Sequence, residues 1–315
     1  MATINVTAPF DGSEIGEVQN SNADDIERAL AKADALFRNR DGWIPLPERL
    51  DILRRTAEII KERREELALQ AAREGGKPLA DSLVELDRAA DGVENCVEVM
   101  RAEGGEVIPM GINPASMGHA AFTQPEPIGV VVAVSAFNHP FNLIVHQVAP
   151  AVATGCPVIV KPAEVTPLSC FSFVEILYEA GLPKDWAQVV VPENLDLSTK
   201  LVTDPRNALF SFIGSARVGW MLRSQLAPGT RAALEHGGAA PVIVAKDADM
   251  AAAIPRLAKG GFYHGGQVCV SVQRIFAHAD IAEDLAAALA AEGDKMKVGD
   301  ATEADTEVGP LNRTA

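Results

Sequence analysis

The segment from residue 128 to residue 226 alternates strands of a buried type with helices, and this alternation limits the chain to a small set of folds. The run Ile128-Gly-Val-Val-Val-Ala-Val-Ser135 is continuously apolar, as in a strand that is covered on both faces. Expected helices and strands then follow in turn: helix 141–153, strand 157–161, helix 166–180, strand 187–191, helix 195–202, strand 209–213 and helix 216–226. This order predicts a mostly parallel α/β sheet that binds ligands at the carboxyl ends of its strands.

The flanking segments differ in character. Helices are expected from Asn22 to about residue 37, from Pro47 to about Arg73, and over 79–101. Residues 104–127 are rich in Gly and Pro and alternate in polarity, which favours a β-hairpin that needs a partner strand. Beyond residue 235, strands at 241–245 and 272–277 and helices at 249–261 and 281–293 predict a second α/β unit.

Composition narrows the classes of function. The chain has 28 Lys and Arg against 43 Asp and Glu, a formal charge of −15, which disfavours nucleic acids and anionic membranes as partners. No apolar run reaches the roughly 18 residues of a membrane helix, and the N-terminus does not resemble a signal peptide, so a cytoplasmic protein is expected. The four cysteines form no CxxC pair, and no metal site is predicted.

Two residues are candidates for covalent and acid–base chemistry. Cys269 lies next to glycines between a helix and an expected strand, where backbone N–H groups can stabilise an oxyanion and lower a thiol pKa. The alternative is a buried structural cysteine. Glu235 precedes two glycines and is a candidate general base, although a solvated glutamate in a turn fits the same pattern.

Further candidates lie at the ends of the expected parallel strands. Asn138 offers an amide donor for an oxyanion, or is simply part of a turn before Pro140. Lys161 and Glu164 are suited to ribose hydroxyls, although surface Lys/Glu pairs are common. Gly214 and Ser215 form a turn before a helix, whose N-terminal N–H groups suit a pyrophosphate; such turns are frequent, so the signal is weak.

Together these segments resemble the aldehyde dehydrogenase superfamily in order, spacing and context. The matching stretches are Glu74-Gly-Gly-Lys-Pro78, Pro125-Glu-Pro-Ile-Gly-Val130, Phe137-Asn-His-Pro140, Lys161-Pro-Ala-Glu164, Phe212-Ile-Gly-Ser-Ala-Arg-Val-Gly219, Leu234-Glu-His-Gly-Gly238 and Gly266-Gln-Val-Cys269. The glycine-rich variants look most like a lactaldehyde or phosphonoacetaldehyde dehydrogenase branch. The resemblance implies a Rossmann-like cofactor domain (1–106 and 126–236), an oligomerisation hairpin (107–125) and an incomplete catalytic domain (237–315).

The resemblance also implies roles for individual residues. Cys269 is the expected nucleophile toward an aldehyde, Asn138 the oxyanion donor and Glu235 the base that activates water against the thioester. The expected cofactor is NAD, with NADP as a possibility. Its expected contacts are Phe137 in the cleft, Lys161 and Glu164 at the ribose, and Gly214, Ser215 and Gly219 at the pyrophosphate. The expected partners are a small-molecule aldehyde and further copies of the chain in a homodimer or homotetramer.

The chain departs from the family pattern in several places. His236 stands where the family commonly has Leu, His264 where it usually has Asn, and Gln147 where many relatives have Lys. Family members are also longer by roughly half, so the resemblance implies that a Glu-x-Phe-Gly-Pro segment and the strand that pairs with the hairpin are missing. Two functions remain open: an active aldehyde dehydrogenase, or a fragment that binds nucleotide at most and is not active alone.

Overall fold

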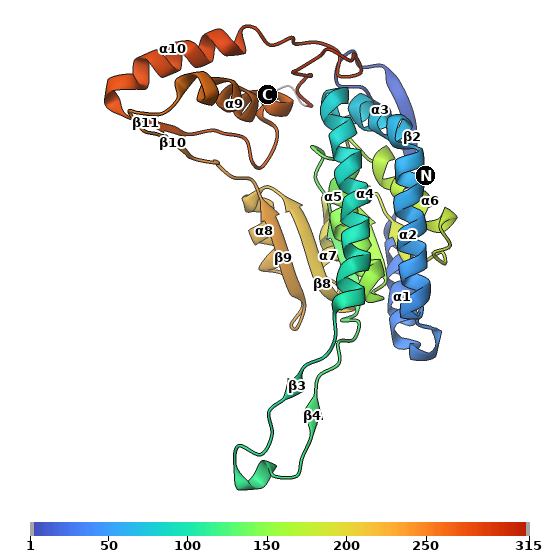
Figure 1. Ribbon diagram of the computed structural model, residues 1–315. Coiled ribbons are helices and arrows are strands. Elements are labelled where there is room, and N and C mark those ends of the chain that lie inside the picture. Colours follow the sequence, from blue (N-terminus) through green and yellow to red (C-terminus); the bar gives the residue numbers. More distant parts are fainter. Residues whose placement is uncertain (1–2, 313–315) are drawn as a thin grey trace.

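A computed structural model describes residues 3–312, and its centre is a five-stranded parallel sheet (Figure 1). The strands lie in the order β7-β6-β5-β8-β9, with β5 in the middle. Their bounds are β5 Val130–Val134, β6 Val158–Lys161, β7 Ala187–Val189, β8 Asn207–Gly214 and β9 Arg231–His236. The predicted α/β class with a parallel sheet is confirmed.

Helices cover both faces of this sheet because its strands are apolar on both sides. Val131 and Ala133 point into a core formed with α2 to α6, whereas Val130 and Val132 point into a core formed with α1, α7 and α8. The helices are α1 Ala23–Arg38, α2 Leu46–Glu62, α3 Arg64–Gly75, α4 Leu79–Ala102, α5 Asn142–Thr154, α6 Leu168–Glu179, α7 Leu195–Thr203 and α8 Ala216–Arg223. Within residues 3–312, no helix has both the length and the apolar character required to cross a bilayer.

The expectation of one helix from Pro47 to Arg73 is wrong, because the chain breaks there into α2 and α3. Arg63 lies between them with φ −104° and ψ 17°. The surrounding sequence, Lys61-Glu-Arg-Arg-Glu-Glu66, contains neither Gly nor Pro, so nothing local marks the break. Tertiary packing determines it, since α3 turns to pack on α4 and α6.

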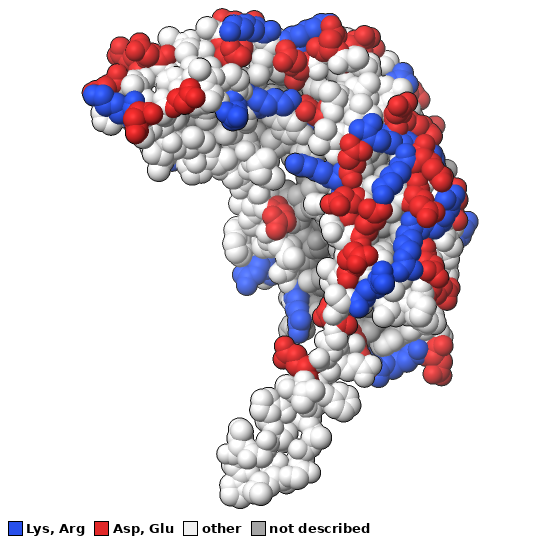
Figure 2. Space-filling view, in the orientation of Figure 1, with Lys and Arg blue, Asp and Glu red and all other residues white. Residues whose placement is uncertain are grey.

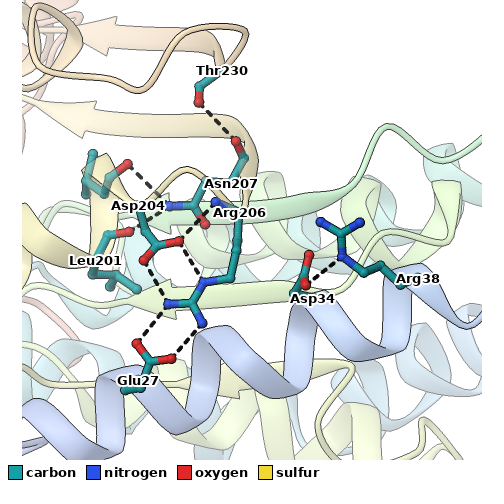
Figure 3. Close-up of polar contacts among 9 residues, drawn as sticks. Glu27, Asp34, Arg38, Leu201, Asp204, Arg206, Asn207 and Thr230 are labelled. Atoms are coloured by element: carbon teal, nitrogen blue, oxygen red, sulfur yellow. Dashed lines mark hydrogen bonds and ion pairs between the residues drawn. The ribbon is translucent and has the colours of Figure 1, made fainter.

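An electrostatic network fastens α1 to the turn between α7 and β8 (Figure 3). The Arg206 guanidinium donates to both carboxylate oxygens of Glu27 on α1, at 2.7 and 2.8 Å, and to Asp204 in its own turn, at 2.8 Å. The Asn207 side chain then donates to the backbone oxygen of Leu201 at 2.7 Å. These contacts fix the start of β8, the strand that leads to the Gly214-Ser215 turn.

A hairpin projects from the body of the molecule at residues 107–122 (Figure 1). Its strands, β3 (Val107–Ile108) and β4 (Ala121–Phe122), pair antiparallel. Val107 and Phe122 are 85% and 75% exposed, and Figure 2 shows no charged residue on the projection. A hairpin therefore forms where one was expected, and its role in oligomerisation stays a prediction.

The chain beyond residue 236 forms a smaller α/β unit. Strands β10 (Val242–Val244) and β11 (Ile275–Ala277) pair in parallel, and α9 (Met250–Phe262) and α10 (Ala282–Gly293) pack against them. The strand expected at 272–277 is shorter than predicted, because residues 270–274 belong to an irregular loop. A separate antiparallel pair, β1 (Thr3–Thr7) and β2 (Glu14–Gln19), lies at the start of the chain.

Candidate active site

The carboxyl ends of the central strands bring the predicted cofactor residues to one edge of the sheet. Val134, near the end of β5, lies opposite Lys161 on β6 and Phe212 on β8. Gly214, at the end of β8, lies opposite His236 on β9. This edge is where an open parallel sheet binds its ligands.

Lys161 and Glu164 form a short polar cluster at the end of β6. The Lys161 ammonium is buried, donates to the backbone oxygen of Pro162 at 3.1 Å and lies 3.5 Å from the Glu164 carboxylate. Burial lowers the pKa of Lys161, and the Glu164 charge partly offsets this effect. Glu164 is itself exposed. A buried ammonium beside an accessible carboxylate is a donor and acceptor set that fits ribose hydroxyls.

The turn into α8 presents free backbone N–H groups at the same edge. Ser215 is the N-cap, and its hydroxyl oxygen accepts a bond from the Val218 N–H at 3.4 Å. The helix N-terminus suits a pyrophosphate through its unpaired donors and dipole. At Gly214, an added Cβ would lie 2.7 Å from the Phe212 ring, so this position has no room for a side chain.

Gly219 and His236 pack against each other rather than toward open space. A Cβ at Gly219 would lie 2.3 Å from His236 Nε2 and 2.9 Å from the Phe212 ring. The His236 ring lies edge-on to both Phe212 and Trp220, with centroids 6.1 and 5.5 Å apart. Gly219 therefore has a packing role between α8 and β9, and His236 contacts that helix.

Asn138 and the loop that carries Cys269 are in direct contact. The Asn138 side-chain N–H donates to the backbone oxygen of Gln267 at 2.8 Å. The Gln267 side chain in turn accepts the Asn312 N–H at 2.9 Å. Asn138, on the β5–α5 loop, is thus bonded to the residue two positions before Cys269, the candidate nucleophile. Cys269 itself is 131 residues further along the chain than Asn138.

Three consecutive residues with positive φ precede Cys269 and bend the chain before its loop. His264, Gly265 and Gly266 have φ values of 49°, 61° and 78°. The Cys269 side chain is exposed, so it is not the buried structural cysteine of the alternative interpretation. Its backbone oxygen lies 2.8 Å from where a Cβ at Gly238 would be, so only glycine allows this approach.

Glu235 lies three residues before Gly238, the residue that contacts Cys269. It is on β9 opposite Ile213, and its side chain is exposed. Its negative charge reaches His146 on α5, where it opposes the lowering of the histidine pKa that burial causes. The structure thus brings together the segments that carry Asn138, Glu235 and Cys269, at the junction of the two α/β units.

Two histidines are held neutral beside this junction. Burial lowers the pKa values of His139 and His264 to about 3. His139 Nε2 lies 3.2 Å from the Tyr263 hydroxyl, and the His264 ring lies edge-on to Phe137 at 6.3 Å. His264 is also a non-glycine residue in the left-handed region, a conformation that Asn adopts more readily.

Contacts between the units hold the Cys269 loop in place. Lys259 on α9 pairs with Asp81 on α4 at 3.0 Å, and the Leu79 N–H donates to the backbone oxygen of Ala301 at 2.8 Å.

Gln147, in the position where many relatives have Lys, donates to backbone oxygens of β5 and β8 beneath the site. It therefore fastens two central strands together.

Glu74, Lys77 and Glu85 were not recognised as functional residues from the sequence, yet all three side chains are fully buried behind the site. A signal was available for Glu85, which falls on the apolar stripe of α4, four residues before the buried Ala89. A carboxylate at such a position must be paired or hydrogen-bonded.

Comparison with known proteins identifies the family. The aldehyde dehydrogenase family model matches residues 1–315. A 3-sulfolactaldehyde dehydrogenase from Priestia aryabhattai is 36% identical over 297 residues, which are 94% of this chain and 61% of that protein. A betaine aldehyde dehydrogenase from Cereibacter sphaeroides is 36% identical over 98% of this chain and 63% of its own length.

Solved structures of aldehyde dehydrogenases also superpose closely on this chain. A glyceraldehyde-3-phosphate dehydrogenase from Methanocaldococcus jannaschii, complexed with NADP, superposes with a TM-score of 0.91 at 31% identity over 98% of this chain and 67% of that one. A betaine aldehyde dehydrogenase double mutant from Staphylococcus aureus, in complex with NAD+, gives 0.94 at 30% identity over 99% and 63%. The chain belongs to the aldehyde dehydrogenase family, and it spans less than two thirds of the curated relatives named above.

Proposed function

We propose that this chain carries the nucleophile, base and dinucleotide site of an NAD(P)-dependent dehydrogenase that oxidises an aldehyde to its carboxylic acid. The observation that carries the proposal is the meeting, at the carboxyl edge of a parallel sheet, of the segments that bear an exposed cysteine, an amide donor and an exposed carboxylate. The Asn138–Gln267 bond of 2.8 Å and the close approach of Gly238 to Cys269 define that convergence.

In this proposal the Cys269 thiolate attacks the aldehyde carbon and forms a thiohemiacetal. The Asn138 amide and the Cys269 backbone N–H stabilise its oxyanion. NAD(P)+, when bound, would supply the hydride acceptor. Once that carbon has lost hydride, Cys269 would hold the acyl group as a thioester. Glu235 takes a proton from a water molecule, which then releases the acid and the free thiolate.

The residues at the sheet edge fit a dinucleotide. Lys161 and Glu164 would hold the adenosine ribose, the start of α8 at Gly214 and Ser215 would hold the pyrophosphate, and Phe137 would line the cleft. Because a carboxylate accepts a bond from a 2′-hydroxyl and repels a 2′-phosphate, Glu164 favours NAD over NADP. Glu164→Gln should then raise the affinity for NADP relative to NAD.

The test is formation of NAD(P)H with a panel of aldehydes. Lactaldehyde, phosphonoacetaldehyde, sulfolactaldehyde and betaine aldehyde belong in the panel, the first two from the sequence resemblance and the last two because similar proteins carry those names. Turnover supports the proposal. No turnover by a folded chain that still binds NAD would contradict it for this chain.

The second candidate function is nucleotide binding without turnover. The smaller α/β unit favours this alternative, because Ile243 on β10 and Phe276 on β11 are 83% and 56% exposed, and apolar strand residues are normally covered. Calorimetric binding of NAD with no hydride transfer to it would select this candidate.

A further inference from the structure

Two buried glutamates bind the N-termini of the two helices that follow the cofactor-side strands β5 and β6. Glu85 Oε1 accepts the backbone N–H groups of Phe141 and Asn142, at 3.0 and 2.8 Å, where α5 begins. Glu74 accepts those of Leu168 and Ser169, both at 2.8 Å, where α6 begins. The segment from the end of α3 into α4 thus supplies the caps of α5 and α6.

The cap on α5 is part of a fully buried ion pair. Glu85 Oε2 is paired with the Lys77 ammonium, and both side chains are completely buried. Phe141, the N-cap residue of α5, makes no side-chain cap of its own. With one oxygen bound to Lys77 and the other to two backbone N–H groups, the Glu85 carboxylate has a fixed orientation.

The bonded N–H groups lie immediately after the Asn138 loop. Phe141 follows Asn138 by three residues, and the end of α3 lies against the same loop, since a Cβ at Gly75 would be 3.6 Å from the Phe137 backbone oxygen. At its other end, the loop reaches the Cys269 segment through the Asn138–Gln267 bond. A shift at the start of α5 would therefore move the Asn138 amide relative to Cys269.

We propose that the Lys77–Glu85 pair is a positioning unit that fixes the β5–α5 loop, and through it the Asn138 amide, against the Cys269 loop. The pair touches no reacting atom. This proposal rests on the proposed function only where it concerns the reaction rate. The effect of the pair on the position of the Asn138 amide does not require a substrate. A charged pair suits this position, since the carboxylate complements the positive end of α5 and Lys77 balances that charge in a dry interior.

The direct test is hydrogen exchange of the Asn138 side-chain amide, measured by NMR and assigned from its disappearance in Asn138→Ala. The variant Lys77→Met/Glu85→Gln removes both charges and preserves volume. Exchange of the Asn138 amide and of the Phe141 and Asn142 N–H groups should become at least about 10-fold faster, because the bonds that hold the loop are weakened. The matched control is Glu74→Gln, which alters the other cap and should leave the Asn138 amide unchanged.

Faster exchange at the α5 N–H groups with an unchanged Asn138 amide would overturn the proposal, and so would an equal effect of Glu74→Gln on that amide. If the double variant does not fold, Glu85→Asp replaces it. Aspartate keeps the charge but is one methylene shorter, so it should give an increase of the same kind and smaller size.

A second readout uses single-turnover hydride transfer. Glu85→Gln should slow this step about 10- to 100-fold, the range expected when an oxyanion donor is misplaced. In an Asn138→Ala background, Glu85→Gln should change the rate of hydride transfer less than about 3-fold, because the amide that Glu85 positions is already absent. Equal effects in both backgrounds would contradict the proposal. If the unsubstituted chain forms no NAD(P)H, the proposed function fails, and the amide exchange still decides the positioning role.

Discussion

Glu74→Gln is expected to change how the stability of the chain depends on pH. Glu74 is fully buried, and its oxygens accept two backbone N–H groups at the start of α6. Burial favours the neutral acid, whereas the N–H donors and the helix dipole favour the carboxylate. Burial is the larger effect here and raises the pKa of Glu74 from 4.5 to about 7.

The size of the effect follows from these two pKa values. The difference between 4.5 and about 7 corresponds to about 3 kcal/mol of folding free energy. Because the pKa is raised in the folded state, this stabilisation is fully present below pH 4.5 and is lost as the pH rises through about 7. Above that range the folded chain must hold a charged carboxylate in its interior.

The assay is urea unfolding of the wild type and of Glu74→Gln from about pH 5 to about pH 8. Glutamine does not titrate. The unfolding free energy of the wild type minus that of the variant should therefore decrease by about 2–3 kcal/mol across this range, most of the full effect. Glu65→Gln, an exposed glutamate on the same helix, is the control for general charge effects. A constant difference, or one that increases with pH, would show that the helix donors outweigh burial at Glu74.

Three further substitutions have defined outcomes. Gly219→Ala should lower the unfolding free energy by about 1–3 kcal/mol in urea titrations, because the new methyl group meets His236 and Phe212 at 2.3 and 2.9 Å; an unchanged midpoint would contradict this. Arg206→Ala removes a guanidinium held by two carboxylates and should cost about 1 kcal/mol, with a smaller loss in high salt, whereas an equal loss at all salt concentrations would exclude an electrostatic cause. Glu235→Gln should preserve the stopped-flow burst of NAD(P)H and slow steady turnover about 100-fold or more; loss of the burst would mean that Glu235 acts before hydride transfer.

Much of the fold follows from local patterns in the sequence. The Asn22 cap with Asp25 three residues later predicts the start of α1, and the structure shows both reciprocal bonds of this capping box. The apolar run at 128–135 predicts a strand covered on both faces, and the residues of the observed strand, β5, enter two different cores. These signals are local, so a single sequence is enough to read them.

What the sequence did not predict depends on contacts between distant segments. The break at Arg63 arises from packing of α3 on other helices. The burial of Lys77 is not visible locally, because lysine at the start of a helix normally lies in solvent. Its partner Glu85 and the bonded Phe141 are 8 and 64 residues further along the chain.

The candidate site shows the same division. Residue types and flanking glycines singled out Asn138, Glu235 and Cys269, and in the structure the segments that carry them meet at one junction, while their catalytic roles stay predictions. The sequence could not show that the Asn138 amide donates to the Gln267 backbone oxygen, because that bond forms between the two α/β units. Nor could it show that the His236 ring packs against Phe212 on β8 and Trp220 on α8.

The most direct test of the account is to locate the acyl group during turnover. Glu235→Gln protein is mixed with NAD(P)+ and an accepted aldehyde, quenched in acid, digested and analysed by mass spectrometry. If Cys269 is the nucleophile, we expect one acyl group on the peptide that contains Cys269, in an amount equal to the NAD(P)H formed. A Cys269→Ala variant that still binds NAD should give neither the acyl group nor NAD(P)H. An acyl group on another residue, or NAD(P)H formed without Cys269, would contradict it.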